Sequence, residues 1–127
     1  MRAEPITGDG WAIAHLDDLG EGPGFRKVRA PLGVTAFGVN GIVLPPAYTS
    51  RRHYHDSQQE LYLVLEGEVE IEFGDGERHP LRRGALARVD PETVRCLHNT
   101  SETEEATIFC VGGAEGYVGR DGHVLDE

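Results

Sequence analysis

Cysteine and long apolar runs are both scarce in this chain of 127 residues. Two cysteines, Cys96 and Cys110, are too few for a disulfide framework, and we interpret both as reduced packing residues. The longest apolar run, 61–65, is far shorter than the roughly 20 residues that a membrane-spanning helix requires. The sequence also lacks a basic start followed by an apolar stretch. We therefore expect no secretory leader, no membrane partner and a cytoplasmic protein.

Basic residues are also in short supply. The 12 Lys and Arg residues against 22 Asp and Glu residues give a formal net charge of −10. A charge of this sign disfavours a nucleic-acid backbone as the main partner. A chain of this length is sufficient for one domain, which buries about two-thirds of its unfolded surface without disulfides.

Sustained helical periodicity is absent, and the nearest approach to it, 11–20, is short. Instead, 17 glycines and 7 prolines recur along the whole chain, as expected for short strands joined by turns. Residues 68–73 alternate between apolar and acidic, which is typical of a strand with one solvated face, and 61–65 indicates a strand buried on both faces. The pattern predicts an all-β sandwich or barrel with strands at 34–44, 51–55, 61–65, 68–73, 77–81, 85–89, 94–98 and 107–111.

Three side chains that can bind a metal lie within eight residues: His53, His55 and Glu60. Residues i and i+2 of a strand share a face, so the two imidazoles project together. A hairpin returning at Glu60 can bring its carboxylate opposite them. Two imidazoles and one carboxylate suit Fe(II), Mn(II), Ni(II), Cu(II) or Zn(II), and they leave coordination positions open for a ligand.

The segment HYHDSQQELYLVLEG resembles the first motif of the cupin superfamily, with His53, His55, Glu60 and Gly67 at the motif positions. The segment GALARVDPETVRCLHN resembles the second motif. Its framework residues are Gly84, Pro91 and Asn99. The resemblance implies a double-stranded β-helix, or jelly roll. It divides the chain into an N-terminal segment (1–33) that packs on the barrel or on a dimer partner, the barrel (34–112) and a C-terminal tail (113–127).

The second motif departs from the family at one position that matters. Arg95 stands where the family supplies a third histidine ligand, and a guanidinium has no lone pair to donate to a metal. Strand alternation turns His98 to the opposite face, unless a one-residue bulge brings it in. Two alternatives stay open. Either His53, His55 and Glu60 hold a metal without a fourth protein ligand, or Arg95 pairs with Glu60, the site holds no metal and the pocket takes a small carboxylate or phosphate.

Taken together, these features predict a cupin that binds a small anionic organic molecule in its barrel, with a divalent metal as the cofactor in question. Arg95 would contact the ligand through its guanidinium, and Tyr62 shares the strand face of Glu60 and would contact it too. A metal-dependent dioxygenase or isomerase and a metal-free sensing module are alternatives, and no catalytic residue can be named. The resemblance to small cupins also implies a dimer. The apolar segment 11–15 precedes the barrel with little core left to fill, so we expect a homodimer.

Overall fold

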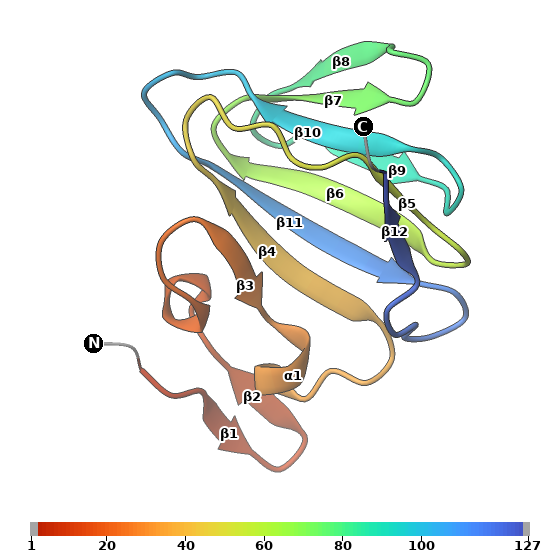
Figure 1. Ribbon diagram of the computed structural model, residues 1–127. Helices are drawn as coiled ribbons and strands as arrows, with labels where there is room; N and C mark the ends of the chain where they lie inside the picture. The colour runs from red at the N-terminus through yellow and green to blue at the C-terminus, as the bar shows by residue number, and fades with distance from the viewer. Residues whose placement is uncertain (1–2, 126–127) are drawn as a thin grey trace.

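Two five-stranded antiparallel sheets form the body of the protein in a computed structural model, which describes residues 3–125 (Figure 1). One sheet has the order β3 (Gly24–Lys27), β4 (Gly38–Leu44), β11 (Ala106–Gly113), β6 (Gln59–Glu66) and β9 (Leu86–Val89). The other has the order β12 (Gly122–Val124), β5 (His53–His55), β10 (Arg95–Asn99), β7 (Val69–Phe73) and β8 (Arg78–Leu81). The all-β jelly-roll prediction is confirmed.

The N-terminal part lies outside the two sheets until β3 joins the edge of the first (Figure 1). It contains a hairpin of β1 (Ile6–Gly8) and β2 (Trp11–Ile13), the 3₁₀ turn η1 (Leu16–Leu19) and the single-turn helix α1 (Arg29–Leu32). The helix ends at Gly33, whose φ of 71° is the left-handed conformation that glycine adopts without strain. Within residues 3–125, neither helix has the length or the apolar character needed to span a membrane.

The core lies between the sheets and follows strand alternation. Along β11, Ala106, Ile108 and Cys110 are buried and point inward, and Val64 and Ile71 meet them from β6 and β7. Val64, Ile71 and Ile108 are each at most 1% exposed, so each contributes about 1.5–3 kcal/mol of burial free energy.

The prediction that residues 61–65 are buried on both faces is wrong at Leu61, which is 43% exposed. The outward face of this sheet is covered in part by the N-terminal segment. An apolar groove there is lined by Ala14, Leu16, Leu19, Val28, Leu32, Leu63, Leu65 and Phe109. That cover reaches Leu63 and Leu65 but not Leu61, so one apolar side chain of β6 faces solvent.

Gly67 ends β6 and sends the chain to β7 in the opposite sheet. Its φ is +84°, and a Cβ at this position would lie 3.0 Å from the Cα of Ala106. Both the backbone conformation and the close approach of β11 therefore require glycine here. This is the physical reason for the glycine in the sequence motif.

Candidate metal centre

The ends of β5 and β6 bring the three predicted ligands together. His53 and His55 project from β5 to one side, with ring centroids 5.3 Å apart and rings at 85°. Glu60 lies near the start of β6, after a three-residue connection. One donor atom from each of the three residues lies within 4.8 Å of the others. The i, i+2 spacing and the short return thus place two imidazoles and a carboxylate around one point.

The C-terminal segment fixes the orientation of His55. Asp121, just before β12, accepts a hydrogen bond from Nδ1 of His55 at 2.8 Å through Oδ1. Its Oδ2 accepts the backbone N–H groups of Ser57 and Gln58 at 2.8 and 3.0 Å. Burial alone raises the pKa of Asp121. Hydrogen bonds from the Gln58 side chain, these two amides and His55 outweigh it and hold the pKa well below its usual range.

The other nitrogen of His55 has no hydrogen-bond partner among residues 3–125. Since Asp121 is an ionised acceptor, Nδ1 of His55 carries the hydrogen, and a neutral ring then presents a lone pair at Nε2. Nε2 is buried and lies 3.3 Å from Oε1 of Glu60. A lone pair and a carboxylate oxygen at this distance repel one another unless a proton or a cation lies between them. This orphaned nitrogen is the observation that fits a metal ion.

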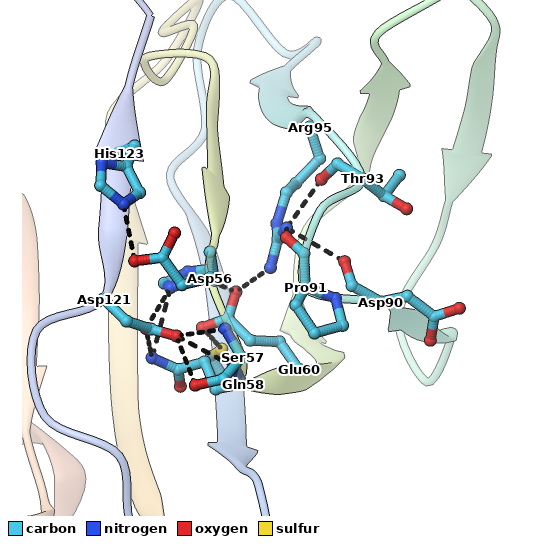
Figure 2. Close-up of polar contacts among 12 residues, drawn as sticks. Asp56, Ser57, Gln58, Glu60, Asp90, Pro91, Thr93, Arg95, Asp121 and His123 are labelled. Carbon is cyan, nitrogen blue, oxygen red and sulfur yellow. Dashed lines mark hydrogen bonds and ion pairs between the residues drawn. The ribbon is translucent and has the colours of Figure 1, made fainter.

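Arg95 is fully buried beside the carboxylate, and the Arg95–Glu60 pair considered from the sequence is present. Its Nη2 donates to Oε1 of Glu60 at 2.7 Å, and its Nε donates to the Tyr62 hydroxyl at 3.3 Å. Nη1 donates to the carbonyls of Thr93 and Pro91 at 2.7 and 3.1 Å (Figure 2). The guanidinium is therefore tied to the turn before β10 as well as to Glu60.

Glu60 also receives two uncharged donors. The Tyr62 hydroxyl donates to Oε1 at 2.6 Å, and the Cys110 thiol donates to Oε2 at 3.4 Å. Burial raises the pKa of Glu60, but the hydrogen bonds from Tyr62 and Arg95 and the nearby charges lower it below its usual value. Burial, together with the charge of Glu60, raises the pKa of both Tyr62 and Cys110. Near neutral pH the group therefore holds one carboxylate and two protonated donors.

His53 is in the form that a metal binds. Burial and then the charge of Arg95 lower its pKa, against the opposing effect of the hydrogen bond to the Arg51 carbonyl at 3.3 Å. A neutral imidazole is the metal-binding state of histidine. The two imidazoles thus fit a divalent cation, and Glu60 completes the set with one oxygen shared with Arg95 and Tyr62.

The side chains of His55 and Glu60 are largely buried, each being 12% exposed, and His53 is half-buried. Two hollows of the surface lie elsewhere: the apolar groove described above and a recess of about 490 Å³ between β7 and β8.

His98 lies away from this group, as strand alternation predicts. Its Nε2 is 2.8 Å from a carboxylate oxygen of Glu72, and Thr49 bonds its Nδ1. Arg95 and His98 thus occupy opposite faces of β10.

Sequence reasoning missed Asp121 and Cys110, since nothing in the local spacing connects either with the HYH segment. Asp121 lies 66 residues from His55.

Known structures with this fold include several bacterial proteins. A sugar phosphate isomerase of the cupin superfamily from Silicibacter pomeroyi is 26% identical, with a TM-score of 0.67. The match covers 81% of this chain and 65% of that protein, so the chain spans about two-thirds of its length. An uncharacterised Klebsiella pneumoniae protein with a double-stranded β-helix domain is 22% identical (TM-score 0.74; 91% and 97% covered).

A cupin protein from Bacteroides fragilis is also 22% identical, with a TM-score of 0.69 and coverage of 92% of this chain and 98% of that one. Among curated proteins no match was found. The family described as "Cupin domain" matches residues 42–112, which include both motifs and more than half of the chain. The chain therefore belongs to the cupin domain family.

Proposed function

We propose that this protein binds a divalent metal through His53, His55 and Glu60 and, at that metal, a small anionic organic molecule. The observation that carries the proposal is the buried Nε2 of His55, which has no hydrogen-bond partner in the described part of the chain and lies 3.3 Å from the carboxylate of Glu60. Such a metal has coordination positions left for a ligand, and as a Lewis acid it attracts and polarises a carboxylate or phosphate oxygen.

Within this proposal, Arg95 and Tyr62 act by holding Glu60. Both bond the same oxygen of Glu60, and Nη1 and Nε of Arg95 have protein acceptors. Arg95 favours an anion through its positive charge rather than by gripping the ligand. Asp121 keeps the His55 ring oriented, as carboxylates commonly do for metal-binding histidines.

The test is calorimetric titration of small phosphates and carboxylates, glucose 6-phosphate and oxalate among them, into Ni²⁺-loaded and chelator-treated protein. We expect binding by the loaded protein that is at least tenfold weaker after chelation and in His55→Ala. Asp56→Asn is the matched control, because Asp56 is exposed and bonds His123 outside the group. Equal binding with and without metal would refute the metal-assisted proposal and favour a metal-free binding module.

A second candidate is isomerisation of a sugar phosphate, which rests on the 26% identity with the Silicibacter pomeroyi protein. A sugar phosphate is itself a small organic anion. Incubating the metal-loaded protein with aldose and ketose phosphates, and following interconversion by NMR, tests this candidate. Turnover that disappears in His55→Ala would support it, and binding without turnover would exclude those substrates.

A further inference from the structure

A second convergence of metal-binding side chains lies on the outer face of the sheet that contains β5, β10 and β7. Cys96 and His98 are two residues apart on β10 and share a face, and Glu72 of β7 stands directly opposite Cys96 in the antiparallel register. One donor atom from each lies within 4.8 Å of the others. Arg95 and Leu97 point to the other side, so this group is separated from His53, His55 and Glu60 by the sheet itself.

The distances between the donor atoms suit a tetrahedral ion. The Cys96 Sγ is 3.6 Å from Nε2 of His98. Zinc bonds of about 2.3 Å to sulfur and 2.0–2.1 Å to nitrogen, at a tetrahedral angle, place these two atoms about 3.6 Å apart. Oε1 of Glu72 is 2.8 Å from the same Nε2 and would move outward by about half an ångström to bind the same ion. Glu72 can make that movement, because its side chain is 23% exposed.

Neighbouring residues orient His98 so that its Nε2 can bind an ion. Thr49 bonds its Nδ1 at 2.8 Å, so Nε2 is the nitrogen that faces Cys96 and Glu72. This is the arrangement in which the outer nitrogen of a metal-binding histidine is held by a neighbouring group. Cys96 is 2% exposed yet lies outside the core cluster, so its thiol is sheltered on the face where the other two donors gather. Nη1 of Arg78 lies 3.8 Å from Oε1 of Glu72, and the Arg78 side chain is 43% exposed, so it can move away when an ion binds.

We propose that Cys96, His98 and Glu72 form a second metal site, selective for Zn²⁺ and independent of the first. A thiolate with an imidazole favours Zn²⁺ over Mn²⁺ or Mg²⁺, whereas the first site offers no thiolate opposite its imidazoles. Three protein ligands leave one position for water or for an external ligand. The bound ion joins β7 to β10 and thereby raises the thermal stability of the sheet.

The experiment titrates Co²⁺ into chelator-treated protein that carries His53→Ala and His55→Ala, so that the first site is disabled. A thiolate ligand gives Co²⁺ a charge-transfer absorption that nitrogen and oxygen ligands do not give. We expect one equivalent of Co²⁺ to develop this band and one equivalent of Zn²⁺ to displace it. Cys96→Ser should abolish the band, and Cys110→Ser, which alters the other buried thiol, should preserve it.

Two milder variants test the site even if Cys96→Ser does not fold. Glu72→Gln should weaken Co²⁺ binding at least tenfold, and Thr49→Val should weaken it by about 10–100-fold through loss of the outer hydrogen bond. Zn²⁺ should also raise the Tm of the protein and leave that of Cys96→Ser unchanged. Absence of the band, or a band that persists in Cys96→Ser and vanishes in Cys110→Ser, would overturn the proposal. Neither outcome bears on the His53 site, since that site is disabled throughout.

Discussion

Replacing Arg95 by methionine tests how much the buried ion pair contributes to the fold. The guanidinium is fully buried and the Glu60 side chain is 12% exposed, so the substitution leaves a nearly buried carboxylate without its cation. It also removes donors from the carbonyls of Pro91 and Thr93. Breaking one side of a buried pair costs 3–5 kcal/mol, and we expect about 4 kcal/mol for Arg95→Met. That loss is a large part of the free energy of unfolding of a typical domain, which is about 5–15 kcal/mol.

Urea unfolding monitored by circular dichroism measures this loss, with Arg78→Met as the matched control. Arg78 pairs with Glu70 at 2.8 Å, but the two side chains are 43% and 34% exposed. Solvent screens such a pair, so the control should cost less than about 1 kcal/mol. In the double variant Arg95→Met with Glu60→Gln, part of the loss should be recovered, because the uncompensated charge is gone. An Arg95→Met cost no larger than the control, or strict additivity in the double variant, would refute the reasoning.

Four further predictions concern metal affinity, the pH dependence of stability and the assembly of the chain. Asp121→Asn should lower Ni²⁺ affinity by about 10–100-fold in calorimetry, while Asp56→Asn leaves it unchanged. Arg95→His should raise Ni²⁺ and Zn²⁺ affinity by adding a fourth ligand, and an unchanged affinity would show that Arg95 does not govern the site. In chelator-treated protein, stability should fall as the pH drops below about 6.5. The pKa of His53 in the folded state lies under its ordinary 6.5, so the unfolded chain binds more protons than the folded chain in this pH range. The lowered pKa of Glu60 adds to the loss of stability below about pH 4.5 for the same reason. A flat stability profile from pH 7 to 4 would contradict this prediction. We propose a homodimer that covers the exposed apolar side chains of the N-terminal hairpin, and a monomeric mass in light scattering at micromolar concentration would exclude it. Those side chains are Ile6, Trp11 and Ile13.

Local patterns predicted eight of the ten strands of the two sheets, because each pattern has a local physical cause. The eight strands expected from residue 34 onward correspond to β4 through β11. The alternation at 68–73 marks the burial of Val69 and Ile71, and the i, i+2 pair at His53 and His55 gives a shared face. The strands that escaped prediction are β1, β2, β3 and β12. Each has three or four residues, too few for a periodic signal, and each lies outside residues 34–112, the span of the family resemblance.

The part of the site that lies within the two sequence motifs was predictable from residue spacing and from the family resemblance. His53, His55, Glu60 and Arg95 converge as the motifs imply. Asp121 could not be found in this way, because its contact with His55 depends on how the C-terminal segment returns to β5.

The position of Cys110 beside Glu60 likewise follows from the pairing of β11 with β6, which residue identity alone does not specify. Leu61 shows the complementary limit. An apolar run indicates burial, but the cover over each face depends on a distant segment, and the N-terminal segment stops short of this residue.

The measurement that tests the account most directly is calorimetric titration of Mn²⁺ into chelator-treated wild type and into His55→Ala. Mn²⁺ favours oxygen and imidazole ligands over thiolates, so it reports on the His53, His55 and Glu60 group rather than on Cys96. The account predicts one Mn²⁺ per chain in the wild type and at least tenfold weaker binding in His55→Ala. Absence of binding in the wild type, or binding of equal strength in both proteins, would contradict it.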